Sequence, residues 1–266
     1  MVLEEDGEEG RPGDVPTAAE VRPAAGLLDR IRSPQGAAWL TLALIAASFA
    51  LGALTSPLVF DTNDDAAMLG ISAGFFGEHV GDPRLVYQSA FLGLLLGGLF
   101  SLFGGFDWYS AFQWSVCVTA YATILYTLLR STRAPWMLPA VAFSALAFLP
   151  PTLFRIQFTQ TAFACVAAAS VILVDLERRR SIEPPSRKSL VVRVAAALIF
   201  CLLAVSLRAA TLPVATALIL GTGLLIATRA GLQGRSALAL SSLFGWSAFA
   251  ILLFVSSTGL GWLEER

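Results

Sequence analysis

Charged residues are scarce in this sequence. Only 14% of its 266 residues are charged and 56% are hydrophobic, with a mean hydropathy of +0.71. Soluble domains carry roughly 25% charged residues. Apolar runs recur from residue 37 onward, and they are continuously apolar rather than alternating. This composition predicts a multi-pass α-helical membrane protein and argues against a β-barrel.

Histidine, cysteine and excess positive charge are also rare. The formal net charge is −1, which gives no electrostatic basis for binding nucleic acid, so no nucleic-acid partner is expected. The single histidine, His79, is interpreted as a surface residue. The cysteines all fall inside apolar runs without metal-ligand spacing, so we expect small buried side chains at Cys117, Cys165 and Cys201.

Several motifs that carry common chemistries are missing. The sequence has no phosphate-binding glycine loop with a lysine, no His-Glu-x-x-His and no Gly-x-Ser-x-Gly. Ionisable residues are almost absent from the apolar runs, apart from Asp175 near the end of one. A proton relay or voltage sensor needs charges inside its spans. The sequence therefore argues against an ion-coupled transporter.

The N-terminal segment does not resemble a cleavable signal peptide. It is acidic, rich in Gly, Pro and Ala, and lacks a basic start, and the first apolar run begins late. We expect residues 1–28 to form a disordered acidic cytosolic tail. Residues 29–266 are expected to form a transmembrane helical domain with an outer acidic loop at 59–84.

The apolar runs predict an all-α fold, a polytopic transmembrane helical bundle with about 7–8 membrane segments. A helix needs roughly 20 apolar residues to cross a bilayer. The expected runs are 37–58, 85–104, 110–129, 135–150, 161–175, 191–207, 211–228 and 236–256.

Basic residues beside the runs indicate the orientation. Arg30 and Arg32 precede the first run, which places the N-terminus in the cytosol and the acidic loop outside the cell membrane. The basic clusters at 130–133, 178–193 and 229–235 also lie on the cytosolic side if 85–104 does not cross singly. That run then dips in and returns, or pairs with 66–77. The alternative is that the positive-inside rule fails here.

The densest acidic group after the tail follows the first run. Asp61, Asp64 and Asp65 place three carboxylates within five residues. Asn63 or Asp64 is expected to cap a helix that begins near Asp65. A carboxylate at a helix N-terminus is favoured as the anion, ready to accept a proton or to bind a divalent metal. The alternative is that these residues only cap the helix and fill the loop.

Two arginines interrupt apolar segments farther along. Arg208 separates two runs, and Arg155 lies close to Gln157 and Gln160. An arginine near membrane depth usually pairs with an anion, and a guanidinium binds phosphate bidentately. A lipid phosphate is therefore one interpretation for Arg155, Gln157 and Arg208. The other is that the arginines reach the lipid head groups from the ends of the spans.

The order of these motifs resembles a bacterial family of polytopic proteins related to the GT-C glycosyltransferases. The resemblance rests on Asn63-Asp64-Asp65-x-x-Met68, on Ile71-Ser72-x-Gly74, on Trp108-Tyr109-Ser110, on Gln157-Phe158-Thr159-x-Thr161-Ala162, and on Ser206-Leu207-Arg208. Together these motifs cover roughly residues 37–215, which would correspond to the N-terminal half of such a protein.

The resemblance implies sugar transfer from a polyprenyl-phosphate donor on the outer face of the membrane. By that likeness Asp64 is the general base and Asp65 orients the acceptor or holds a metal. Asp61, Gln157, Arg155 and Arg208 are expected to bind the substrate, with the arginines at the departing lipid phosphate.

The chain departs from the family in length. GT-C proteins are generally much longer, with further spans, so we expect this chain to be a fragment, a degenerate copy, or half of an assembly in which a membrane-protein partner supplies the missing C-terminal part. A fold likeness alone does not establish function. The alternatives are a non-catalytic scaffold or lipid-binding subunit and, less favoured, a lipid or sugar transporter.

Overall fold

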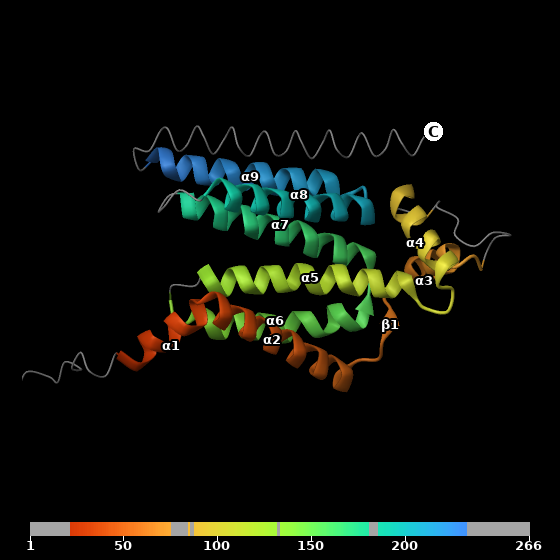
Figure 1. Cartoon of the computed structure of the whole chain (residues 1–266), viewed down its shortest axis with the longest axis horizontal. Coiled ribbons are helices and arrows are strands. Elements are labelled where there is room, and N and C mark those ends of the chain that lie inside the picture. The colour runs from red at the N-terminus through yellow and green to blue at the C-terminus, as the bar shows by residue number, and fades with distance from the viewer. Residues whose placement is uncertain (1–21, 76–84, 86–87, 132–133, 181–185, 233–266) are drawn as a thin grey trace, which may run out of the picture.

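Long helices that run side by side dominate the structure, a computed structural model that describes residues 22–75, 85, 88–131, 134–180 and 186–232 (Figure 1). Five helices in this part of the chain are long and apolar enough to cross a membrane. They are α2 (Pro34–Thr55), α5 (Trp108–Ser131), α6 (Met137–Phe154), α7 (Phe158–Arg180) and α8 (Arg187–Leu207). The expected helical, membrane-embedded class is confirmed, whereas a count of 7–8 spans is not.

The remaining elements are shorter or less apolar. They are α1 (Arg22–Arg32), β1 (Val59–Phe60), α3 (Asn63–Ser72), α4 (Ala90–Leu102), β2 (Arg155–Ile156) and α9 (Thr211–Leu232). Residues 22–28 were expected in the disordered tail, but they belong to α1, which begins at Arg22. The expected run at 236–256 lies outside the described residues.

Serine side chains define where three helices begin. The hydroxyl oxygens of Ser33, Ser89 and Ser186 accept hydrogen bonds from backbone N–H groups in the first turns of α2, α4 and α8. The first N–H groups of a helix have no partner within the helix, so such caps fix its start. These caps give the apolar runs sharp N-terminal boundaries.

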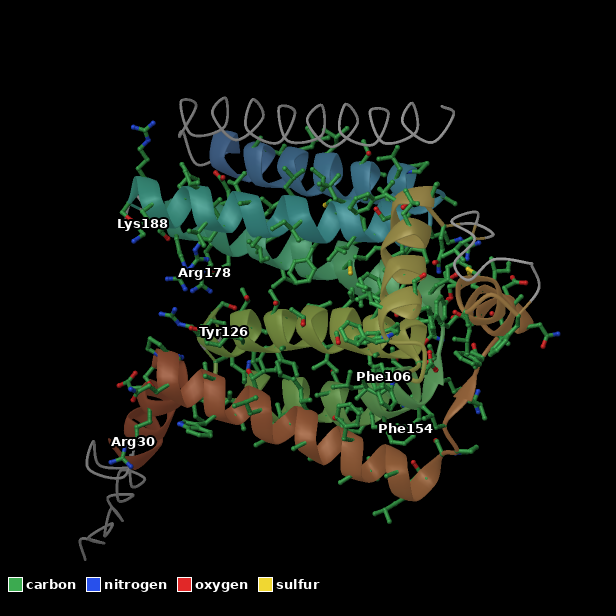
Figure 2. The ribbon with its side chains drawn as sticks, turned by 45° about the vertical axis from the view of Figure 1, so that its right-hand side comes forward. Arg30, Phe106, Tyr126, Phe154, Arg178 and Lys188 are labelled. Atoms are coloured by element: carbon green, nitrogen blue, oxygen red, sulfur yellow. The ribbon has the colours of Figure 1, made fainter. Side chains whose placement is uncertain are left out.

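The bundle has two chemically different ends, which we call the Asp65 end and the arginine end. At the Asp65 end, α2, α6 and α8 finish, α5, α7 and α9 begin, and the short elements β1, α3, α4 and β2 gather (Figure 1). Figure 2 shows Phe106 and Phe154 at this end and Arg30, Arg178 and Lys188 at the opposite one. Basic residues of α1, α7 and α8 therefore gather at one end of the bundle.

Helix α4 has both of its ends at the Asp65 end. The Ser89 N–H donates to the Ser206 carbonyl oxygen at 2.9 Å, and Trp108 Nε1 donates to the Phe103 carbonyl oxygen at 3.0 Å. Its 13 residues span about 20 Å at 1.5 Å per residue, less than a hydrocarbon core of about 30 Å. Helix α4 alone is thus shorter than the hydrocarbon core, and the expectation that the run 85–104 does not cross singly stays a prediction.

Small residues bring α7 close to its neighbours. Ala162, Cys165 and Ala169 on α7 and Cys201 and Ala204 on α8 are fully buried. Apolar helices pack tightly where small side chains let their backbones approach. Helix α7 also packs against α5, so it lies at the centre of the bundle. The expected burial of all three cysteines is confirmed.

Candidate functional site

Two short strands join distant parts of the chain at the Asp65 end. They pair in parallel, with Val59 opposite Arg155 and Phe60 opposite Ile156. The Asp61 N–H extends the pairing by donating to the Ile156 carbonyl oxygen at 3.1 Å. This pairing places the Arg155 guanidinium 3.9 Å from the Asp61 carboxylate. Two residues expected from the sequence to bind substrate thus form one exposed ion pair.

The helix that carries the acidic group begins earlier than expected. Helix α3 starts at Asn63, and Thr62 occupies the N-cap position, whereas Asn63 or Asp64 was expected there. The Thr62 hydroxyl makes no bond to the helix backbone and donates instead to Asp65 Oδ2 at 2.7 Å. Asp64 and Asp65 consequently both lie in the first turn, where the helix dipole favours negative charge.

Asp65 is fully buried and accepts three hydrogen bonds from three different segments. Besides Thr62, the Tyr109 hydroxyl of α5 donates to its Oδ1 at 2.8 Å and the Phe158 N–H of α7 donates at 3.1 Å. The Phe158 N–H opens α7 and has no partner within that helix. Asp65 therefore caps α7 from a distance and fastens α3, α5 and α7 together.

Burial raises the pKa of the Asp65 carboxyl above its ordinary value of 3.8, because the charged form loses water. The three hydrogen bonds oppose this rise by stabilising the carboxylate, and the negative charge of Asp64 adds to it. The neighbouring Asp64 side chain is exposed, in contrast to Asp65. Two adjacent carboxylates thus differ in their surroundings, one enclosed and one open to solvent.

The described residues do not fit the divalent metal suggested for Asp65. They contain no group of three or more His, Cys, Asp or Glu side chains placed to hold a metal ion. Both Asp65 oxygens already accept hydrogen bonds. The enclosed carboxylate therefore serves as an acceptor for protein donors.

Arg208 reaches the same first turn of α7 from the end of α8. Its Nη1 donates to the Thr159 hydroxyl, and its guanidinium lies 5.6 Å from the centre of the Phe158 ring. The backbone there is extended, and Thr211 caps the chain by donating to the Arg208 carbonyl oxygen at 2.7 Å. Arg208 is thus held by α7 and half buried, with no part in the Asp61–Arg155 pair.

A pocket of about 600 Å³ opens beside the Asp61–Arg155 pair. Gln160 joins the pair at its polar mouth, and its walls are formed by α5, α6 and α7: Tyr121, Ile124, Phe148, Pro151, Thr152, Phe163, Ala164 and Ala167. A second pocket of about 290 Å³, almost entirely apolar, continues along α5 and α6 towards Trp136 and shares Tyr121, Ile124 and Phe148 with the first. We call the two together the α5–α6 groove.

The structure therefore divides the expected site residues into three places. Asp61 and Arg155 line the mouth of the α5–α6 groove, Asp65 is an internal clamp, and Arg208 stands on the first turn of α7. Gln157 precedes α7 and is outside the pocket lining, whereas Gln160 is part of it. Tyr109 and Thr62, which hold Asp65, were not assigned to the site. The sequence feature that could have indicated Tyr109 is its polar hydroxyl at the start of an apolar helix.

Comparison with known proteins identifies no relative. No family model, no curated protein and no solved structure matches this chain.

Proposed function

We propose that this protein is a membrane glycosyltransferase that binds a polyprenyl-phosphate-linked sugar in the α5–α6 groove and transfers the sugar at the Asp65 end. The observation that carries the proposal is the groove itself. A single charged pair, Asp61 and Arg155, stands at the mouth of an apolar channel that follows two membrane-length helices. This combination suits a ligand with an anionic head and a long apolar chain.

The charge distribution supports an outward-facing Asp65 end. The basic residues of the described helices, among them Arg30, Arg130, Arg178 and Lys188, belong to the other end. Cytosolic ends of membrane helices carry the excess of lysine and arginine. In this orientation the protein resides in the cell membrane with its N-terminus in the cytosol and its acidic loop outside.

Arg155 supplies the phosphate contact in this proposal. Its side chain is 61% exposed at the pocket mouth, so a lipid phosphate can reach it and displace Asp61. The existing ion pair at 3.9 Å is exposed and contributes little to stability, so replacing Asp61 by a phosphate costs little free energy. The lipid chain then lies against Phe148, Ile124 and the apolar walls beyond them.

Asp64 is the base in the proposed reaction. Its exposed carboxylate takes the proton of an acceptor hydroxyl as the acceptor oxygen bonds to the anomeric carbon. The bond between that carbon and the phosphate oxygen breaks, and its electron pair leaves with the polyprenyl phosphate. Arg155 stabilises the negative charge that the phosphate gains. The buried Asp65 fixes the first turn of α3 and so positions Asp64.

Lipid binding without sugar transfer is the second candidate function. It is favoured by the engagement of Asp65, whose oxygens are taken up by Thr62, Tyr109 and Phe158 rather than facing the groove. A scaffold subunit needs the groove and Arg155 but has no use for Asp64 as a base. Both functions therefore require lipid binding at Arg155, and only sugar transfer requires Asp64.

The first experiment measures binding of polyprenyl phosphate to the purified full chain in detergent. Arg155→Gln should weaken binding about tenfold, the loss expected when one charged hydrogen bond to an anion is removed. Lys188→Gln is the matched control, since Lys188 is exposed at the arginine end, and it should bind as the wild type does. Equal binding by all three proteins would refute the groove assignment.

The second experiment measures transfer of sugar from a polyprenyl-phosphate donor by proteoliposomes. Asp64→Asn should abolish transfer while polyprenyl phosphate still binds, because asparagine cannot accept the proton. Asparagine keeps the shape and the capping ability of aspartate, so α3 is retained. Binding without any transfer by the wild type would select the scaffold function. Full transfer by Asp64→Asn would remove Asp64 from the mechanism.

A further inference from the structure

A second polar cluster lies at the arginine end, inside the bundle. Asp175 of α7 is only 4% exposed, and its Oδ2 accepts from Arg179 Nε and from Arg193 Nη1, each at 2.7 Å. One carboxylate oxygen thus holds two guanidinium groups. The other, Oδ1, is buried without a hydrogen-bond partner. A buried acceptor left unsatisfied is costly in a folded protein.

These residues line a pocket of about 280 Å³ between α5, α7 and α8. Arg130 of α5 completes the charged lining, with its guanidinium 5.8 Å from the centre of the Tyr126 ring. The Nε of Arg130 is buried and has no hydrogen-bond partner. Three arginines face one aspartate, so the lining carries a net charge of about +2. Tyr126 is part of the same lining, and Figure 2 shows it near the arginine end of the bundle.

The lining selects the chemistry of a ligand. Partly buried positive charge is stabilised by an anion, and the planar guanidinium group is suited to phosphate. The unsatisfied Asp175 oxygen calls for a hydroxyl donor beside that phosphate. One side of the pocket is apolar, where Ile172 and the 60% exposed Val192 lie. This side suits the glycerol and upper acyl region of a lipid.

We propose that this pocket binds the head group of an anionic phospholipid that carries hydroxyl groups, such as phosphatidylglycerol. The phosphate contacts Arg130 and the outer faces of Arg179 and Arg193, and a head-group hydroxyl donates to Asp175 Oδ1. Basic pockets between membrane helices bind such lipids on the cytoplasmic side. The site is separate from the α5–α6 groove and independent of the function proposed there.

Native mass spectrometry of the full chain with added lipid tests this proposal. Phosphatidylglycerol should bind the wild type, and phosphatidylcholine, which lacks both the net charge and the hydroxyls, should bind at least about tenfold more weakly. Arg130→Gln should weaken phosphatidylglycerol binding about tenfold. This variant leaves the Asp175 pairs with Arg179 and Arg193 in place, so the fold is preserved.

Arg187→Gln is the matched control, because Arg187 is exposed at the same end but outside the pocket. It should bind phosphatidylglycerol as the wild type does. An equal loss in both variants would mean attraction by surface charge alone and would overturn the proposal, as would equal binding of the two lipids. Binding of inorganic phosphate to the wild type and to Arg130→Gln is measured as well. If it binds the wild type but not Arg130→Gln, and phosphatidylglycerol binds neither, the site takes soluble phosphate and the lipid assignment is wrong.

Discussion

The Tyr109 hydroxyl donates a 2.8 Å hydrogen bond to Asp65 Oδ1 across 44 residues of sequence. Both side chains are fully buried. The bond connects the first turn of α3 to the first turn of α5, and the Phe158 N–H extends the connection to α7. One carboxylate thus joins α3, α5 and α7 at the Asp65 end. Its exposed neighbour Asp64 lies in the same first turn of α3.

Removing the Tyr109 hydroxyl should destabilise the protein. Tyr109→Phe deletes a hydrogen bond to a buried charged group, which costs about 1.5–3 kcal/mol. It also removes the acceptor for Gln88 Nε2, which donates to the same hydroxyl at 3.2 Å. The thermal midpoint in detergent should fall accordingly. Tyr126→Phe is the control, because its ring contact with Arg130 survives the change, and an equal fall there would contradict the special role of Tyr109.

Asp65 should tolerate asparagine far better than alanine. The asparagine oxygen can accept from Tyr109 and Phe158, and the Thr62 hydroxyl can turn to accept from the new amide. Alanine leaves all three donors without an acceptor in a buried place, at a cost on the order of 3 kcal/mol. Thermal unfolding of both variants measures the difference. Equal destabilisation by the two substitutions would show that negative charge, not hydrogen bonding, is what the clamp requires.

The raised pKa of Asp65 predicts a dependence of stability on pH. The folded state holds this proton more tightly than the unfolded state, whose pKa is near 3.8. The stabilising contribution is therefore complete below 3.8 and is lost as the pH rises through the folded-state pKa. Thermal midpoints measured from pH 4 to 7 should decline less in Asp65→Asn, which cannot titrate, than in the wild type. Parallel curves would contradict the assignment to Asp65.

The coarse architecture follows from the sequence for physical reasons. Apolar runs of sufficient length must form helices in a membrane, because every backbone polar group needs a partner there. The positions of α2, α5, α6, α7 and α8 were predictable for that reason. The run 85–104 was expected not to cross singly because the basic clusters would otherwise fall on both sides. The course of this run through a membrane stays a prediction.

The division of labour within the acidic stretch could not be read from the sequence. Asp64 and Asp65 are adjacent and differ by about 100° around α3, so tertiary packing decides which one is buried. That packing involves Tyr109 and Phe158, which lie far along the chain. The pairing of β1 with β2 was equally hidden, because strands of two residues carry no periodic pattern. Without it, the contact between Asp61 and Arg155 could not be anticipated.

Gly52 should be sensitive to even the smallest side chain, because α2 approaches α6 closely there. A Cβ at position 52 would lie 2.4 Å from Cδ2 of the Phe154 ring, which packs edge-on against Phe49. Gly52→Ala should therefore displace the ring and cost about 1–3 kcal/mol, as overpacking does elsewhere. Gly98→Ala is the matched control on α4, where a new Cβ meets no atom within 4 Å.

The control should even gain slightly in stability, by about 0.5–1 kcal/mol, because alanine is the better helix former. Combining Gly52→Ala with Phe154→Leu should recover part of the loss, since the smaller side chain makes room for the new methyl group. The three thermal midpoints, compared with the wild type, decide the matter. A double variant no more stable than Gly52→Ala would mean that the ring is not what the methyl group meets. That result would contradict a close contact between Gly52 of α2 and Phe154 of α6.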